Sequence, residues 1–328
     1  MSIAAYLKEI GRGKDGARPL SAAQAEDLLR QVFAGNVSDV QLGAFVIAMR
    51  IKGESPAELA GFVAAAQAQI APTIAAALQR SPRTVVWLPS YNGARKLPNL
   101  TPLLAGLLAQ QGLAVMVHGP ALDPVRVTSH AVFSALGWSA IDSADDASAI
   151  NAAWARQQPV WVSTDALCPP LARLLDLRWQ VGLRNPGHSV AKLLALPSSP
   201  AQRSLRVVNH THPEYGESLA QFLAETRADA LLLRGTEGEP VADARRTPGM
   251  AAFVAGQRVE ALSVPAQGGV LAHLPDLPSA IDAASTAAFT VAVLRDPSRA
   301  PAPLQAQVRA ITALAGHIAQ TRAQGQAA

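Results

Sequence analysis

Apolar and polar positions in the first seventy residues alternate with the spacing of amphipathic helices. This pattern predicts helices over about residues 22–34 and 38–52, and a third that begins at Pro56. Each start carries a capping signal, namely Ser21 with Gln24, Ser38 or Asp39, and Ser55 with Pro56 and Glu58. The N-terminal part, residues 1–72, is therefore expected to form a small helical domain.

From about Thr84 the pattern changes to short, continuous apolar runs. The runs lie at residues 85–88, 114–117, 160–162, 205–208 and 230–233, and helices are predicted between them over residues 100–111, 127–135 and 217–226. Continuous β-branched runs that alternate with helices are typical of a parallel sheet buried on both faces. We therefore expect an α/β domain over residues 73–328 with a mostly parallel central sheet.

The loops that follow the predicted strands should meet at one edge of this sheet, because crossover connections are right-handed. Ligands bind at that edge in open α/β sheets. The charged and imidazole side chains expected along it are Arg95, Lys96, His118, His210, His212 and Arg234. No GxGxxG or GxxxxGK[ST] pattern follows any of the predicted strands, so a dinucleotide site and a P-loop lack motif support.

Composition narrows the class of protein. With 328 residues, of which 49% are hydrophobic, the chain can bury a large core. Its single cysteine, Cys168, allows no internal disulfide and no thiolate zinc cluster, which fits a reducing compartment. The N-terminus lacks the apolar stretch of a signal peptide, and no run reaches the roughly 18 apolar residues of a membrane span. A cytoplasmic protein is expected.

The charge is unevenly distributed around a formal net value of +4. Between residues 81 and 141 the only acid is Asp123, and between residues 161 and 211 Asp165 and Asp176 face six cations. Such a bias favours an anionic partner, although an ordinary solvated charge remains the alternative for any single residue.

The segment RNPGHSVAKLL, residues 184–194, has the signals of a helix start. Asn185 can cap the helix and Pro186 suits its first position. His188 and Lys192 are then four residues apart on one face, beside a helix N-terminus that attracts anions. The alternative is an ordinary capped helix with exposed cations.

Four segments together carry a family resemblance: PSYNGARKLPNLTPLLAGLLAQQG, VHGP, RNPGHSVAKLL and RGTEGEPVAD. With them the chain resembles the anthranilate phosphoribosyltransferase family, and most closely its nucleic-acid-binding, YbiB-like paralogues. The resemblance implies a nucleoside phosphorylase or phosphoribosyltransferase-like fold. It also implies a homodimer that forms through the N-terminal helices, joined by helices from residues 165–195, and that carries a basic groove.

The chain departs from the enzymes of this family at their main motifs. The glycine-rich diphosphate loop GTGGD is replaced by residues 89–96, NIST by Asn99-Leu-Thr101-Pro, and KHGN by Val-His118-Gly-Pro. The adjacent aspartate and glutamate that hold magnesium in the enzymes fall near Glu237-Gly-Glu239, where the adjacent pair is lost. Phosphoribosyl transfer needs magnesium to neutralise the leaving diphosphate. No catalytic residue, metal site or cofactor is therefore expected.

The sequence thus predicts a homodimer that binds nucleic acid, DNA or RNA and preferably single-stranded, without sequence preference and without catalysis. Tyr91 would stack on an unpaired base, the alternative being that it packs the loop against the sheet. The other expected contacts are Arg95, Lys96, Arg184, His188 and Lys192, then Arg126, Arg173, Arg178 and Arg234, with His118, Asn99 and Thr101 from the altered motifs.

Other functions remain open. The main alternative is a phosphoribosyltransferase or related glycosyltransferase that uses phosphoribosyl diphosphate, with magnesium, and an unknown acceptor; a third is a structural partner protein. His210 and His212 invite a metal interpretation, but no third ligand has a recognisable spacing, so a loop pair is preferred. Glu237 and Glu239 are expected in a solvated acidic turn rather than around a weakly held magnesium.

Overall fold

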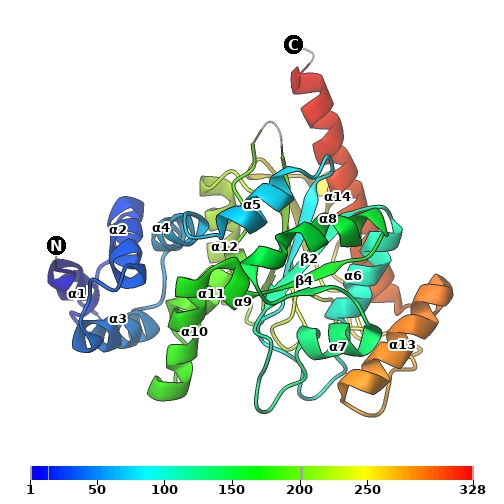
Figure 1. Cartoon of the computed structure of the whole chain (residues 1–328), viewed down its shortest axis with the longest axis horizontal. Helices are drawn as coiled ribbons and strands as arrows, with labels where there is room; N and C mark the ends of the chain where they lie inside the picture. Colours follow the sequence, from blue (N-terminus) through cyan, green and yellow to red (C-terminus); the bar gives the residue numbers. More distant parts are fainter. Residues whose placement is uncertain (1, 14, 200–201, 327–328) are drawn as a thin grey trace.

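The computed structural model describes residues 2–13, 15–199 and 202–326, the last five of these as backbone only (Figure 1). Its N-terminal helices are α1 (Ala4–Ile10), α2 (Ala22–Phe33), α3 (Asp39–Lys52) and α4 (Pro56–Gln67). Ser21, Ser38 and Ser55 each accept a hydrogen bond from the third helical N–H of the helix that they start. The three predicted helix starts are confirmed, because each hydroxyl satisfies a donor that the first turn leaves free.

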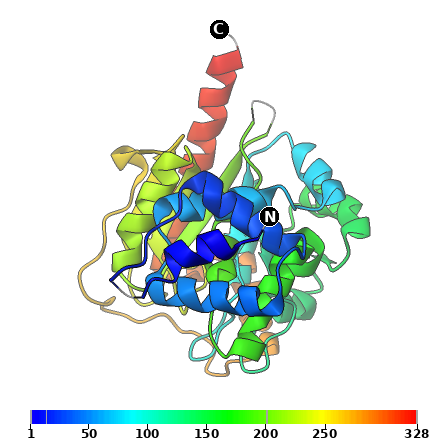
Figure 2. The ribbon, with the colours of Figure 1, turned by 90° about the vertical axis from the view of Figure 1, so that its left-hand side faces the viewer.

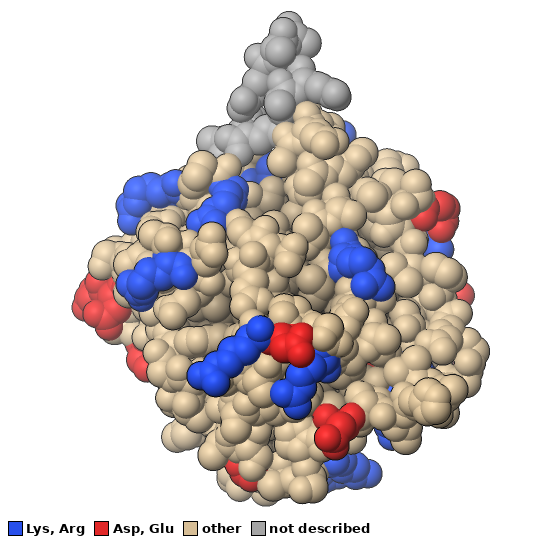
Figure 3. Space-filling view, turned by 90° about the vertical axis from the view of Figure 1, so that its right-hand side faces the viewer, with Lys and Arg blue, Asp and Glu red and all other residues tan. Residues whose placement is uncertain are grey.

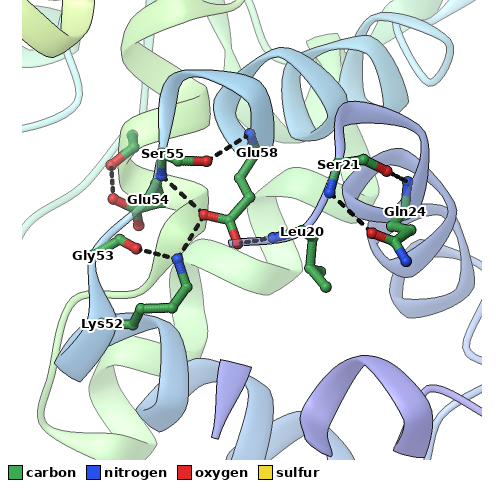
Figure 4. A network of polar contacts seen from close by, with 9 residues as sticks. Leu20, Ser21, Gln24, Lys52, Gly53, Glu54, Ser55 and Glu58 are labelled. Carbon is green, nitrogen blue, oxygen red and sulfur yellow. Dashed lines mark hydrogen bonds and ion pairs between the residues drawn. The ribbon is translucent and has the colours of Figure 1, made fainter. Parts of the chain in front are cut away.

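A buried ion pair holds the corner between α3 and α4 (Figure 4). The Glu58 side chain is fully buried, and its Oε2 lies 2.6 Å from Lys52 Nζ. Its two oxygens also accept the backbone N–H groups of Leu20 and Ser55, both at 2.9 Å. One carboxylate therefore joins the start of α2 to the α3–α4 corner, and Ser189, which donates to Glu54 at 3.4 Å, links this corner to the α/β part.

The sheet has eight strands in the order β3-β4-β2-β1-β5-β6-β7-β8. Its strands are β1 (Val85–Pro89), β2 (Ala114–Gly119), β3 (Ala140–Ile141), β4 (Val160–Ser163), β5 (Ser204–His210), β6 (Asp229–Arg234), β7 (Met250–Val254) and β8 (Gln257–Arg258). The pairings from β3 to β6 are parallel, and β7 and β8 continue the sheet antiparallel. All five predicted strands are present, and the predicted fold class is confirmed. The short edge strands β3 and β8, and β7 beside β8, were not predicted.

Successive strand residues face two separate cores. On β1, Val85 and Trp87 belong to the core shared with the N-terminal helices, whereas Val86 and Leu88 belong to the opposite one. Helices cover both faces, which is why these strands read as continuous apolar runs. The remaining helices are α5 (Pro72–Gln79), α6 (Thr101–Gln110), α7 (Ser129–Leu136), α8 (Ser148–Ala155), α9 (Thr164–Leu167), α10 (Pro169–Val181), α11 (Pro186–Leu193), α12 (Glu214–Glu225), α13 (Ala283–Arg295) and α14 (Ala302–Gln326).

The helical part sits at one end of the molecule. Figure 2 looks onto this end and shows α1, α2 and α3 as the outer layer. Helix α4 lies between α2 and the α/β part, where it contacts α11 and α12. In the described part of the chain, no single helix is both long and apolar enough to cross a membrane; α4 and α5 meet that test only as a pair bent by 97°, on length and composition alone.

Candidate functional site

The loop after β1 lies at the carboxyl edge of the sheet, as predicted, and folds tightly against the end of β2. Gly93 has φ 69°, a left-handed conformation that favours glycine. A Cβ atom on Gly119 would lie 1.8 Å from the carbonyl oxygen of Ser90. Only a glycine at the end of β2 lets the loop backbone pass this closely.

The carboxylate of Glu239 fills the centre of this loop. One oxygen, Oε1, accepts the backbone N–H groups of Asn92 at 3.0 Å and Gly93 at 2.7 Å. The other, Oε2, accepts the hydroxyl of Thr101 at 3.0 Å and that of Ser90. Glu239 is buried, 1% exposed, and this burial raises its pKa. The prediction of a solvated acidic turn was wrong for Glu239, because the fold turns it inward.

Glu237 occupies the next amides along the same loop. Its carboxylate accepts the backbone N–H groups of Arg95, Lys96 and Leu97, all at 3.1 Å. Glu237 itself has φ 52°, which is rare for a residue with a side chain and costs about 1–3 kcal/mol. The strained backbone conformation at Glu237 is therefore part of the turn that places both carboxylates in the loop.

Converging backbone N–H groups of this kind form an anion-binding cradle. Here the cradle is satisfied by two carboxylates of the chain itself. The same contacts test whether the pair could hold magnesium: Glu239 accepts four hydrogen bonds and Glu237 three, so the pair does not fit a metal site. No group of three His, Cys, Asp or Glu side chains suited to a metal occurs within the described ranges.

Two predicted histidine contacts are buried. His118 is 1% exposed, and burial lowers its pKa to about 4. His188 is 5% exposed and its ring accepts the backbone N–H of Asn185 as part of the cap of α11. Burial, reinforced by the cations Arg184 and Arg178, lowers the pKa of His188 to about 3. Both rings are neutral near pH 7, so the predicted cationic face of α11 keeps only Lys192.

The polar residues carried over from the altered motifs also point inward. Tyr91 is 4% exposed and meets the His188 ring edge-on, with ring centroids 6.1 Å apart, so a base could stack on it only after the loop moved. Asn99 is buried and donates to the carbonyl of Val127 and the hydroxyl of Ser129. Thr101 is buried against Glu239. These three side chains build the loop rather than a surface.

Four cations instead surround an open hollow beside the closed cradle. The hollow has a volume of about 440 Å³, and its basic residues are Lys96, Arg234, Arg245 and Arg246. All four are exposed, while Arg245 also pairs with Asp243 at 2.8 Å. The sequence prediction included Lys96 and Arg234 but missed Arg245 and Arg246. Their signal is the double arginine six residues after Glu239.

Further cations lie near two histidines of this part of the molecule. Burial lowers the pKa of His210, and the nearby cations Lys192 and Arg234 lower it in the same direction. Lys192 acts likewise on His188, together with Arg184 and Arg178. We call these cations, namely Lys96 and Arg234 at the hollow with Lys192, Arg184 and Arg178 near the two histidines, the basic rim.

Other predicted cations have partners of their own. Arg184, within the rim, donates to the side chain of Asn92, and Arg126 donates to the carbonyl of Gly93 at 3.2 Å. Arg178 pairs with Asp123 at 3.5 Å and lies 4.1 Å over the Trp179 ring. Arg95 is exposed on the loop, and Arg173 is exposed on α10. His210 bonds the backbone carbonyl of His212 at 3.0 Å, as in an ordinary loop pair.

The face at the opposite end from α1–α3 has a different character. Figure 3 shows its lysines and arginines as separate groups, interspersed with acids and divided by uncharged surface. They form no continuous basic stripe on the part of this face that the structure describes. This face therefore differs from the hollow beside the cradle, where four cations gather.

Comparison with known proteins gives this chain clear relatives. The model of the glycosyl transferase family, helical bundle domain, matches residues 4–70. The uncharacterized protein YbiB of Escherichia coli is 41% identical over 248 residues, which cover 76% of this chain and 75% of that protein. The anthranilate phosphoribosyltransferase of Symbiobacterium thermophilum is 27% identical over 236 residues, 71% of this chain and 64% of the enzyme.

Solved structures share the fold. Anthranilate phosphoribosyltransferase from Thermus thermophilus superposes with a TM-score of 0.64 at 21% identity, covering 97% of this chain and 92% of the enzyme. The Saccharomyces cerevisiae enzyme in complex with PRPP and Mg gives a TM-score of 0.62 at 10% identity, covering 98% and 91%.

Proposed function

Since this chain belongs to the anthranilate phosphoribosyltransferase-like family, we propose that it keeps the family's anion-binding edge but uses it to bind nucleic acid without catalysis. The ligand is the phosphate backbone of DNA or RNA, preferably single-stranded, bound without sequence preference in the cytoplasm. One observation carries this proposal: the chain's own glutamates occupy the loop cradle, while the cations around it remain exposed.

The filled cradle and the exposed cations distinguish nucleic-acid binding from phosphoribosyl transfer. A diphosphate that enters the cradle must displace Glu239, which is buried and accepts four hydrogen bonds. A polyanion that runs along the basic rim meets exposed Lys96 and Arg234 without entering the cradle. Phosphate contacts of this type supply affinity that does not depend on base sequence.

A homodimer extends this rim. Helix α3 exposes Val40, Ile47 and Ile51, and a mostly apolar hollow of about 360 Å³ separates α3 from α1. Exposed apolar patches of this kind mark protein interaction surfaces. We propose that two copies associate through the N-terminal helices. Light scattering after size exclusion tests this directly, and a monomer at micromolar concentration would contradict it.

The binding proposal is tested by fluorescence anisotropy with a labelled single-stranded oligonucleotide. The test variant replaces Lys96, Lys192 and Arg234 with alanine, and each of the three side chains is at least partly exposed. Binding should weaken alike for unrelated sequences, and the salt slope, plotted as log K against log salt, should fall by about 0.7 for each lost contact.

A matched control removes the same charge elsewhere. Arg295, Arg299 and Arg309 are exposed and lie on other elements, so their replacement with alanine changes the net charge equally. This control should bind like the parent protein. Equal weakening in both variants would mean that net charge, rather than the basic rim, governs binding, and the proposal would fail.

Phosphoribosyl transfer is the second candidate, favoured by the relatives named anthranilate phosphoribosyltransferase. It requires that phosphoribosyl diphosphate displace Glu239 from the cradle. Calorimetric titration with this compound and magnesium decides the matter: tight, metal-dependent heat would support an enzyme, and its absence would remove this candidate.

A further inference from the structure

A second basic hollow lies at the opposite edge of the sheet, where β5 and β6 begin. It has a volume of about 380 Å³ and is bordered by α4 and α12. Three arginines line it: Arg203 and Arg206 at the start of β5, and Arg227 before β6. The cradle and the basic rim lie at the other, carboxyl ends of these strands, so this hollow is a separate site.

Only one acid lines this hollow within the described residues, and it is already engaged. Asp229 lies 3.2 Å from Arg203 Nε, and its other oxygen accepts the backbone N–H of Ala255 at 2.7 Å. One carboxylate therefore faces three guanidinium groups. The hollow keeps a surplus of positive charge that an anion would neutralise.

Arg206 is the unusual member of the three. It is 6% exposed, and its Nε donates to the carbonyl of Leu193 at 3.0 Å. Its two terminal nitrogens donate no hydrogen bond to any group in the described part of the chain. Burial lowers the pKa of Arg206 to about 10, so the group stays charged at neutral pH. The Asp229 carboxylate offsets part of this burial cost, and an anion in the hollow would offset more of it.

We propose that this hollow binds the phosphate group of a small phosphorylated molecule. The planar fork of Arg206 offers paired donors that match phosphate oxygens, and Arg227 supplies a second charge at the exposed mouth. Val63, Ala64 and Phe222 give one wall an apolar surface for the rest of the ligand. The volume lies within the range of small-molecule sites.

The test measures binding of inorganic phosphate, pyrophosphate and ribose 5-phosphate to the full chain by calorimetry. Arg206→Gln removes the buried fork. Arg227→Asn removes the exposed charge and suits the backbone, because Arg227 has φ 49°, which asparagine tolerates. Each change should weaken phosphate binding at least about 10-fold. Arg299→Asn, which lines neither hollow, is the matched control and should bind phosphate like the parent, whereas Arg246→Asn tests whether phosphate binds at the hollow beside the cradle instead.

The outcomes separate this site from the basic rim. Saturable binding that Arg227→Asn weakens, with oligonucleotide binding unchanged, supports the proposal independently of the proposed function. No saturable binding at millimolar phosphate overturns it, and so does binding that only Arg246→Asn weakens. If Arg206→Gln does not fold, Arg227→Asn alone decides. Unchanged affinity in both would mean that Arg206 only caps the end of α11.

Discussion

Glu239→Ala should destabilise the protein by leaving the loop cradle without its acceptor. The backbone N–H groups of Asn92 and Gly93, 3.0 and 2.7 Å from Glu239 Oε1, would lose their partner in a buried site. A buried donor without a partner costs about 1–3 kcal/mol. In the opposite direction, Glu239→Ala no longer buries a carboxylate, and the raised pKa of Glu239 shows that this burial is unfavourable. We therefore expect a loss of about 2–4 kcal/mol.

Glu239→Gln is the matched variant, because it keeps the shape of the side chain. The amide oxygen can take the place of Oε1, and the amide nitrogen can donate to the hydroxyls of Ser90 and Thr101, which also accept. Glu239→Gln loses the charge on these hydrogen bonds but also the cost of burying that charge, so the expected net cost is below about 1 kcal/mol. The two variants thus distinguish loss of charge from loss of the acceptor.

Urea denaturation followed by circular dichroism measures both values. Formate should then stabilise Glu239→Ala, since it can enter the vacated cradle; at ten times its dissociation constant it would restore about 1.4 kcal/mol. The parent should respond to formate no more than to sodium chloride at equal ionic strength. The reasoning would be refuted if Glu239→Ala were as stable as Glu239→Gln and indifferent to formate.

The pH dependence gives an independent check of the same site. A carboxyl whose pKa is raised on folding favours the native state when it is protonated, and this contribution is lost as pH rises through the folded-state pKa. The parent should therefore gain stability relative to Glu239→Gln as pH falls from 7 toward that pKa. A difference that stays constant with pH would contradict the burial argument.

Two further predictions concern the ends of β1 and β2. Burial lowers the pKa of His118 from 6.5 to about 4. As the pH falls from 6.5 to 4, the parent should therefore lose roughly 3 kcal/mol of unfolding free energy. His118→Phe should lose less in the same denaturation series. Gly119→Ala should lower the melting temperature strongly, because the added Cβ would lie 1.8 Å from the carbonyl oxygen of Ser90. The control Gly43→Ala, in α3 with nothing within 4 Å, should gain up to about 1 kcal/mol. Equal effects of the two alanines would contradict the close approach.

The sequence was sufficient to predict the five parallel strands β1, β2, β4, β5 and β6 and the edge where their loops meet, because both follow from local patterns. Continuous apolar runs mark strands buried on both faces, and the serine caps satisfy donors within three residues of themselves. The loop after β1 and the cations Lys96 and Arg234 were therefore placed at the carboxyl edge in advance.

The filling of the cradle depended on contacts that no local pattern reveals. Glu239 lies 147 positions after Asn92 in the chain, and only the pairing of β1, β5 and β6 brings them together. His188 shows a second limit. Helical spacing places it on one face with Lys192, but its role in the cap of α11 turns the ring into the core. The distribution of charge along the chain favoured an anionic partner but could not indicate which cations remain exposed.

The central claim is that the family's edge now binds phosphate chains along its basic rim and leaves the cradle closed. A competition experiment followed by fluorescence anisotropy tests this most directly. A labelled single-stranded oligonucleotide is first bound to the protein. Phosphoribosyl diphosphate with magnesium is then added, and its effect is compared with that of sulfate at equal ionic strength. The account predicts that the oligonucleotide binds, that added salt weakens it, and that phosphoribosyl diphosphate displaces it no better than sulfate. Displacement by micromolar phosphoribosyl diphosphate, or no oligonucleotide binding at low salt, would contradict it.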